Sequence, residues 1–149
     1  MRAVFQRVSR AEVRSEGRVT GRIGAGAVIL LGVAQSDTEA DAEKLAGKVA
    51  KLRVFDDADG KMNLPISSVP DGKFIVVSQF TLLGETAKGN RPSYIAAAPP
   101  EQAEALYEKF VACLRTMGFS VETGIFRTMM QVELVNDGPV TLWLDTGEK

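Results

Sequence analysis

The segment KFIVVSQFTLL, residues 73–83, is the most strand-like stretch of the chain. Its first half is apolar on both faces, which is typical of a strand buried at the centre of a sheet. Its second half, Ser78-Gln79-Phe80-Thr81-Leu82, brings polar side chains into that apolar run. If the strand continues through this stretch, successive side chains point to opposite faces of the sheet. A strand that becomes polar at its end often delivers groups to a cleft, so this end is a candidate site.

Other strand-like runs and two amphipathic patterns flank this segment. The runs expected to form further strands are residues 2–8, 11–14 and 18–23 (a hairpin), 27–33, 53–55, 119–122, 129–135 and 140–144. A capping box, with Ser36 as N-cap and Glu39 at the third position, predicts a helix to about residue 52. A second helix is predicted over residues 101–117. We therefore expect one α+β domain over residues 1–149, with a mainly antiparallel, barrel-like sheet and two main helices.

The residue types that the chain lacks restrict its chemistry. The sequence contains no histidine, which excludes Ser-His-Asp and Cys-His catalysis and histidine-based zinc sites. Its single cysteine, Cys113, falls on the apolar side of the second predicted helix, so we interpret it as a buried structural thiol. Any reaction must use carboxylates, lysine, arginine, hydroxyls, backbone groups or the substrate itself. We expect no metal and no other cofactor.

The acidic stretch Asp56-Asp57-Ala58-Asp59-Gly60 superficially resembles a calcium loop. If Gly60 held the sixth position of such a loop, Phe55 would be the first residue and Ile66 the twelfth, and neither can bind calcium. An acidic turn is the better interpretation. A metal-dependent hydrolase that uses these aspartates stays open as an alternative, which a chelator would test.

The formal net charge is −1, but the positive charge is concentrated at the N-terminal end. Residues 1–22 hold six arginines against two glutamates, a local balance of +4. Arginine suits bidentate contacts with phosphate, and a solvated hairpin face explains the same pattern equally well. The chain has neither a signal-peptide pattern nor an apolar run of about 18 residues. We therefore expect a cytoplasmic protein without a membrane partner.

The stretch Asn136-Asp137-Gly138-Pro139-Val140-Thr141 lies between the last two predicted strands. Its first four residues favour turns, so the pattern predicts a hairpin connection. Glycine directly before proline is also the arrangement in which a cis peptide is most accessible and the carbonyl can be approached closely.

The stretch at residues 78–82 can act without a titratable side chain. Ser78 or Thr81 could be a nucleophile, but no histidine is available to activate either hydroxyl. Backbone amides at the strand end could instead form an oxyanion hole. The same hydroxyls could also simply satisfy backbone groups. The loop predicted over residues 84–100 is long for a compact domain, and such loops are usually functional.

Five stretches of the chain together resemble the D-aminoacyl-tRNA deacylase family. They are Gln6-Arg7-Val8, Gly60-Lys61-Met62-Asn63, Ser78-Gln79-Phe80-Thr81-Leu82, Arg91-Pro92-Ser93 and Asn136 to Thr141. The Ser-Gln-Phe-Thr and Asn-x-Gly-Pro-x-Thr stretches are the two signatures of that family, and both are intact. The resemblance covers nearly the whole chain.

The resemblance implies an enzyme that hydrolyses the ester between the 3′-terminal adenosine of tRNA and a D-amino acid, or glycine mischarged on tRNA(Ala). Gly138 and Pro139 would form a cis pair whose carbonyl groups leave no room for an L side chain. The amides of Gln79 and Phe80 would stabilise the oxyanion, while Ser78 and Thr81 shape the pocket and the terminal ribose hydroxyl assists catalysis.

The resemblance also assigns supporting residues and an assembly. Arg7 would support the Gly-Pro segment, and Asn136, Thr141 and Met130 would belong to the substrate-binding set. The family works as a homodimer in which the Gly-Pro pair of one subunit completes the site of the other.

This chain departs from the family pattern at Phe126-Arg127-Thr128-Met129-Met130. Relatives usually carry small residues where Arg127 and Thr128 stand here, near the expected adenosine pocket. The competing hypothesis is a non-catalytic tRNA-binding or RNA-binding protein that uses the N-terminal arginine face. The low aromatic content, 7%, gives that hypothesis little material for base stacking.

Overall fold

The computed structural model describes residues 1–147. Its strands are β1 (Arg2–Ser15), β2 (Arg18–Ile23), β3 (Gly26–Gly32), β4 (Phe55–Asp56), β5 (Met62–Leu64), β6 (Lys73–Ser78), β7 (Val121–Thr123) and β8 (Met130–Asp145). Its helices are α1 (Glu39–Lys51) and α2 (Pro100–Thr116), with 3₁₀ turns η1 (Ile66–Ser68) and η2 (Phe80–Leu83). None of the helices in this part of the chain has the length and hydropathy needed to cross a membrane.

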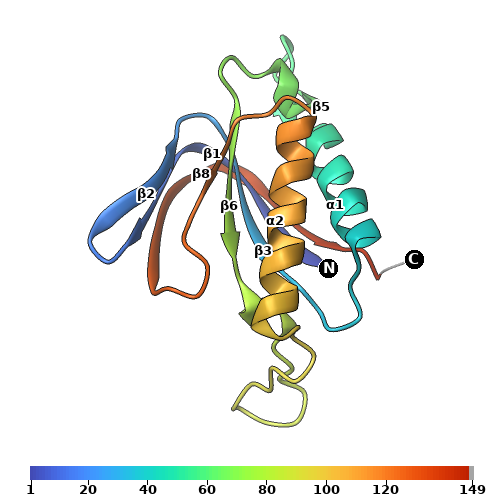
Figure 1. Ribbon diagram of the computed structural model, residues 1–149. Coiled ribbons are helices and arrows are strands. Elements are labelled where there is room, and N and C mark those ends of the chain that lie inside the picture. The colour runs from blue at the N-terminus through green and yellow to red at the C-terminus, as the bar shows by residue number, and fades with distance from the viewer. Residues whose placement is uncertain (148–149) are drawn as a thin grey trace.

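The main sheet is organised around β1, the long strand that starts at the N-terminus (Figure 1). β1 pairs antiparallel with β3 through residues 2–8, with β2 through residues 11–15, and with β8 along most of its length. The β3–β6 and β6–β7 pairs are parallel. The sheet is therefore mixed, although the antiparallel pairs include its longest strands.

The two ends of the sheet curl toward each other. A Cβ atom placed on Gly21 of β2 would lie 2.9 Å from the carbonyl oxygen of Thr123 in β7, so the two backbones are in direct contact. Glycine is required here because any side chain would push the two strands apart. The predicted α+β fold with two helices and a barrel-like sheet is confirmed.

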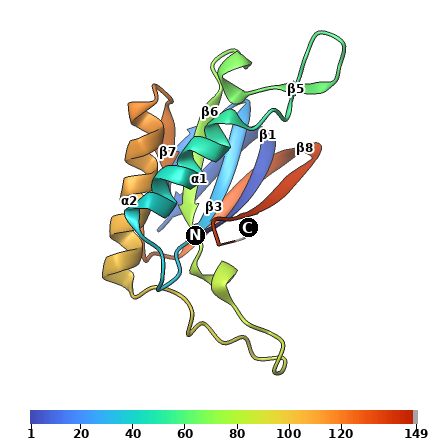
Figure 2. The ribbon, with the colours of Figure 1, turned by 90° about the vertical axis from the view of Figure 1, so that its right-hand side faces the viewer.

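Two hydrophobic cores lie on opposite faces of the sheet. One lies between the sheet and the helices, which sit side by side on one face (Figure 2), and its largest members include Phe5, Phe74 and Phe110. The other fills the barrel and includes Val13 and Ile75. Both faces of β6 are therefore covered, as its continuous apolar run predicted. Each fully buried side chain of this size contributes roughly 1.5–3 kcal/mol.

β8 is one strand of 16 residues, where the sequence predicted two strands joined by a hairpin turn. Both halves pair with β1, with Asn136 opposite Val8 and Thr141 opposite Gln6. Residues 137–140 thus stand opposite Arg7 alone, which makes this segment a large bulge. The hairpin prediction was wrong because the turn-forming residues bend the strand outward without reversing it.

Two other boundaries differ from prediction. β6 ends at Ser78, and residues 80–83 turn into η2, so the expected alternation of faces does not continue through the signature stretch. The N-cap of α1 is Thr38, whose amide donates to Asp41 Oδ2 (2.9 Å), where Ser36 and Glu39 had been predicted. The short strand expected at 53–55 is Phe55–Asp56.

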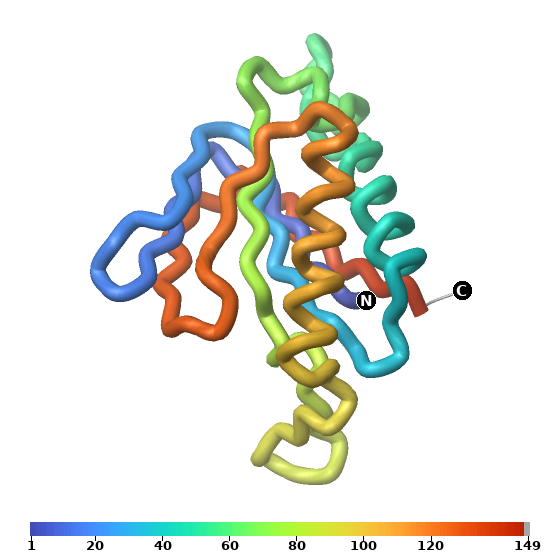
Figure 3. Tube along the Cα trace, in the orientation of Figure 1, coloured from blue at the N-terminus to red at the C-terminus, as the bar shows by residue number. Residues whose placement is uncertain are grey.

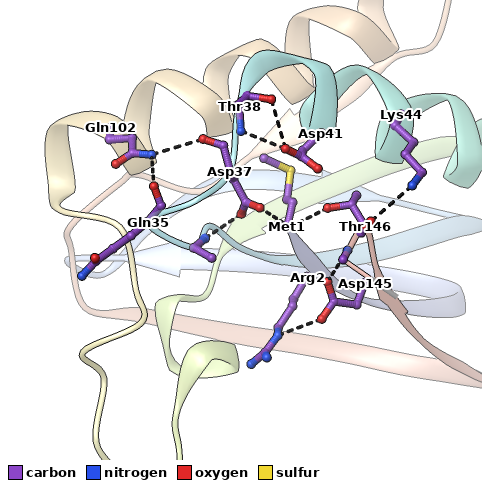
Figure 4. A network of polar contacts seen from close by, with 12 residues as sticks. Met1, Arg2, Gln35, Asp37, Thr38, Asp41, Lys44, Gln102, Asp145 and Thr146 are labelled. Atoms are coloured by element: carbon purple, nitrogen blue, oxygen red, sulfur yellow. Dashed lines mark hydrogen bonds and ion pairs between the residues drawn. The ribbon is translucent and has the colours of Figure 1, made fainter. Parts of the chain in front are cut away.

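Asp37, which precedes the N-cap of α1, binds the N-terminus (Figure 4). The α-ammonium group of Met1 donates to Asp37 Oδ1 (2.5 Å) and to Thr146 Oγ1 (2.7 Å). Asp37 Oδ2 accepts a bond from the Ala34 amide (2.6 Å). The side chains of Met1 and Asp37 are 0% and 7% exposed. This buried ion pair ties the N-terminus to the loop before α1 and to the end of β8.

Candidate functional site

The Ser78–Thr81 stretch lies on the wall of a pocket of about 820 Å³. β6 delivers the stretch to the pocket, the loop before α2 and the start of that helix form a second wall, and the segment before β8 forms a third. The lining residues are Leu31, Val33, Val77, Ser78, Gln79, Phe80, Thr81, Tyr94, Ala97, Ala98, Pro100, Ala103, Phe126, Arg127, Thr128, Met129, Met130 and Val132. A largely apolar pocket with few polar groups is the usual form of a small-ligand site.

Hydrogen bonds decide which groups of this stretch are available to a ligand. The backbone amide of Gln79 donates to the carbonyl of Leu31 (2.8 Å), so the expectation that this amide faces an oxyanion is not met in the structure. The amide of Phe80 opens η2 and has no acceptor within that turn. The side-chain amide of Gln79 donates to Thr81 Oγ1. An amide nitrogen cannot act as a base, so this contact does not activate Thr81 as a nucleophile.

Two aromatic rings that line the pocket contact each other. Phe80 packs edge-to-face against Tyr94, with ring centroids 5.1 Å apart, yet 55% of Phe80 is exposed. Tyr94 belongs to the long loop over residues 84–99, which extends away from the body of the molecule (Figure 3). Glu85 and Ser93 exchange backbone bonds of 2.8 and 3.0 Å that close this loop at its base. The predicted long loop is therefore present, and Tyr94, Ala97 and Ala98 at its base line the pocket.

The bulge of β8 carries the second signature. The Gly138-Pro139 peptide bond is cis, and both residues are exposed. Asn136 Nδ2 donates to the carbonyls of Arg7 (2.8 Å) and Val140 (3.1 Å), and Thr141 Oγ1 donates to Asn136 Oδ1 (3.2 Å). Asn136 and Thr141 thus close the neck of the bulge.

Arg7 holds the bulge from beneath. It is only 5% exposed, and its Nε donates to the carbonyl of Asp137 (3.0 Å). Its Nη1 donates to the Val54 carbonyl (2.7 Å) and to Asp56 Oδ1 (3.2 Å). The guanidinium group therefore ties the bulge to the segment that follows α1.

The two signature stretches do not meet within one chain. None of residues 136–141 lines the pocket that contains Ser78–Thr81, while Met130 does. A Cβ atom on Gly138 would meet no described atom within 4 Å, so the bulge points into open space. Among the residues predicted for the site, one group surrounds the pocket and the other forms the separate bulge.

The N-terminal arginines are largely neutralised by carboxylates. Arg10 donates to Glu133 Oε1 (2.8 Å), and Arg22 Nε donates to Glu12 Oε2 (2.6 Å). The hydrogen bond from Arg10 and the charge of Arg14 lower the pKa of Glu133. Among the six arginines, Arg2, Arg7, Arg10, Arg14 and Arg22 all form ion pairs. This arrangement matches the solvated hairpin face more closely than an open phosphate-binding surface.

The acidic stretch after β4 is the predicted turn. Asp57 Oδ1 accepts bonds from the amides of Asp59 (2.9 Å) and Lys61 (3.0 Å), and these bonds lower its pKa. The carboxylate of Asp56 contacts Arg7. Two of the three aspartates are thus engaged within the turn and with Arg7.

Comparison with known proteins identifies the family. The family model described as D-Tyr-tRNA(Tyr) deacylase matches residues 4–145. The chain belongs to this deacylase family. A D-aminoacyl-tRNA deacylase from Anaeromyxobacter dehalogenans is 62% identical over 98% of this chain and 97% of its own length. One from Koribacter versatilis is 57% identical over 98% and 97%. The resemblance seen in the sequence is confirmed, as is the prediction of a hydrolase that acts on ester bonds.

Solved structures share the same fold. The c-Myc DNA Unwinding Element Binding Protein has a TM-score of 0.91 and 38% identity, with 99% of this chain and 100% of that one covered. A probable eukaryotic D-amino acid tRNA deacylase has a TM-score of 0.80 and 16% identity, covering 96% and 97%. The second likeness concerns the fold alone.

Sequence reasoning missed Tyr94 as part of the pocket wall. Residues 91–93 had been noted, but nothing in the pattern of the loop showed that its base folds back onto Phe80. Arg127 had been noted as a departure from the family near the expected adenosine pocket, and it does line the pocket. Its left-handed backbone (φ 63°) has no signature in the sequence.

Proposed function

We propose that the protein hydrolyses the ester bond of D-aminoacyl-tRNA in the pocket beside Ser78–Thr81, releasing the free D-amino acid and tRNA. Family membership supports the reaction class. The observation that carries the proposal is the position of the intact Ser-Gln-Phe-Thr signature on the wall of an apolar pocket of about 820 Å³. The reaction is one of translation quality control, so we propose that the protein works in the cytoplasm, where charged tRNA is used.

Catalysis in this proposal depends on the backbone and on the RNA. No carboxylate, lysine or cysteine is found among the residues that line the pocket within the described chain, and the sequence has no histidine. The neighbouring hydroxyl of the terminal ribose then assists attack on the ester carbon. The amide of Phe80 stabilises the developing oxyanion, and Ser78, Gln79 and Thr81 shape the site around it. Removal of one such donor typically lowers the rate by about 10²–10³-fold.

Chiral selection is assigned to the Gly138-Pro139 carbonyls of a second copy of the chain. The bulge is exposed and does not reach the pocket of its own chain, so it is available to another subunit. β8 also pairs with β1 alone in the described chain, and exposed Val135 (42%) and Trp143 (47%) lie along it. A long unpaired edge with apolar side chains is a ready site for association. The proposed unit is therefore a homodimer.

In this proposal, a wall of backbone would accept many different D side chains. It rejects an L side chain by exclusion, since no attractive contact with any particular D side chain is required. Glycine has no side chain to exclude, so glycyl-tRNA mischarged on tRNA(Ala) is included among the proposed substrates.

The Phe80 amide can be tested with a substitution that removes its N–H, compared with one that removes only the ring. Proline is accepted at the first position of a helical turn, where the N–H has no intrahelical partner. We expect Phe80→Pro to reduce single-turnover hydrolysis of D-tyrosyl-tRNA by about 10²-fold or more. Phe80→Leu, which loses the ring and keeps the amide, is the matched control and should retain most activity.

Three results would contradict parts of this proposal. Equal loss in the proline and leucine variants would show that the ring, and not the amide, matters. Hydrolysis of L-tyrosyl-tRNA as fast as D-tyrosyl-tRNA by the unaltered protein would remove chiral selection. Salt-sensitive tRNA binding without any hydrolysis would favour the nucleic-acid-binding alternative, which the name of one structural relative also suggests.

A further inference from the structure

Arg127 is the one charged residue among those that line the pocket in the described chain. The other lining residues are apolar, aromatic or uncharged polar groups. Arg127 is exposed, and it forms no ion pair with any residue described in 1–147, unlike most of the N-terminal arginines. An unpaired guanidinium group at the wall of an apolar pocket favours a ligand that brings negative charge to that place.

The backbone of Arg127 is held in a conformation that its side chain disfavours. Its φ angle is 63°, in the left-handed region that favours glycine. The hydroxyl of buried Ser15 donates to Thr128 Oγ1 (2.7 Å), and Thr128 Oγ1 donates to the Ile125 carbonyl (2.9 Å). These bonds fix the turn that contains Arg127. Strain of this kind is found where the surrounding structure enforces it and often marks a functional position.

The chemistry of the substrate supplies the negative charge. The ester cleaved at the pocket is attached to the terminal ribose of the RNA, and the same ribose carries the last phosphodiester of the chain. When the ester lies against Ser78–Thr81, that phosphodiester must lie in the pocket or at its rim. We propose that Arg127 binds the phosphodiester of the 3′-terminal nucleotide and thereby positions the ester. This inference rests on the proposed function, and it adds a contact that the two family signatures do not contain.

Kinetics on two substrates, one with and one without the phosphate, separate phosphate binding by Arg127 from a general effect of the substitution on the pocket. We expect Arg127→Gln to lower kcat/KM on D-tyrosyl-tRNA about 10- to 100-fold, mainly through KM, because hydrogen bonds between charged groups have this strength. On D-tyrosyl-adenosine, which has the ester and no phosphate, the variant and the unaltered protein should be equal. Arg127→Lys should recover part of the loss, since it restores the charge but not the bidentate geometry.

The charge of Arg127 can be tested through the salt dependence of binding, with a variant far from the pocket as the control. Each phosphate contact on a single strand contributes about 0.7 to the slope of log affinity against log salt, so Arg127→Gln should reduce that slope by about 0.7. Lys48→Gln removes an exposed cation from α1, which does not line the pocket, and should leave rate and slope unchanged. Equal losses on the substrates with and without phosphate, or no loss on either, would overturn the proposal.

A binding measurement keeps the result independent of catalysis. The unaltered protein should bind adenosine 5′-phosphate more tightly than adenosine, and Arg127→Gln should abolish that difference. If the difference is found but no hydrolysis occurs, the proposed function fails while the phosphate contact stands. Arg127→Gly should raise Tm by about 2–4 °C because glycine relieves the left-handed strain, while it loses the same activity as Arg127→Gln.

Discussion

Tyr107 shows how one buried polar group is accommodated in the core between the sheet and the helices. It is 7% exposed, and its hydroxyl donates to the Val76 carbonyl of β6 (2.7 Å). Burial disfavours the phenolate and raises the pKa of Tyr107 to about 12, with a smaller opposing effect of Arg115 and a small further rise from Glu108. The hydroxyl therefore links α2 to the strand that delivers the pocket.

Replacement of Tyr107 by phenylalanine should have an effect that changes with pH. At pH 8 we expect Tyr107→Phe to reduce the free energy of unfolding by about 1–2 kcal/mol, because the hydrogen bond to Val76 is lost. Between the unfolded pKa of 10.0 and the folded pKa of about 12, only the unfolded state of the natural protein loses the proton. Its stability should therefore fall as pH rises through this window, and the phenylalanine variant should lack that part of the fall.

Denaturant unfolding at a series of pH values measures this difference. The gap between the two proteins should narrow from pH 9 to pH 12. A gap that stays constant over this range would show that Tyr107 ionises equally in the folded and unfolded states.

A comparison of predicted and observed element boundaries shows which strands and helices the sequence pattern could predict and which it could not. Continuous apolar runs predicted β3 and the start of β6, and helical patterns predicted α1 and α2 to within a few residues, since these elements bury their apolar side chains in the two cores. The bulge was misread as a hairpin because turn chemistry is local. Whether the chain reverses after Pro139 depends on β1, which pairs with both halves of β8. The cap of α1 was misplaced because the sequence offers two capping boxes two residues apart, Ser36 with Glu39 and Thr38 with Asp41, and the structure forms the second.

Arg7 is expected to control the shape of the β8 bulge. Lysine keeps the charge but lacks the planar fork that reaches Asp137, Val54 and Asp56 in different directions. We expect Arg7→Lys to lower the free energy of unfolding by about 1–3 kcal/mol, since the buried cation keeps only part of its hydrogen bonds.

An exposed pair supplies the control for Arg7. Arg10 contacts Glu133 across the surface of β1 and β8, and such pairs contribute at most about 1 kcal/mol. Arg10→Lys should therefore change stability by less than Arg7→Lys in the same urea titration. Equal effects would mean that the buried bonds of Arg7 add nothing beyond its charge.

The fold class of the whole molecule could be predicted from the sequence, but the topology of its sheet could not. Counts of strands and helices indicated an α+β domain, while the parallel pairing of β3, β6 and β7 and the close contact of Gly21 with β7 depend on residues far apart in the chain. The candidate site was likewise predicted only in part. Its two signatures were readable from the sequence, whereas their separation in one chain was implied only by the resemblance to the family and by no local pattern.

That separation leads to a mixing experiment on the proposed dimer. Gly138→Phe places a large side chain where the chain itself leaves open space, so it should fold but fill the pocket of a partner. Phe80→Pro should inactivate its own pocket and keep an intact bulge. Each variant alone should be nearly inactive, whereas an equal mixture should recover about one quarter of the natural activity, because half of the dimers hold one complete site.

The assembly state must be followed in the same samples. Light scattering should show dimers for both variants and for the mixture after subunit exchange. Dimers that exchange without any recovery of activity would show that each bulge acts on its own chain, and a natural protein that is monomeric while active would have the same meaning.

The burial of the Met1 ammonium group has a practical consequence for anyone who handles this protein. An affinity tag, a formyl group or an acetyl group on that nitrogen would replace a cation by a neutral amide beside Asp37, which would then be a buried carboxylate without its partner. The loop before α1 and the end of β8 would lose their common anchor. Preparations that differ only in how translation started or where a tag was fused should therefore not be assumed to have the same stability.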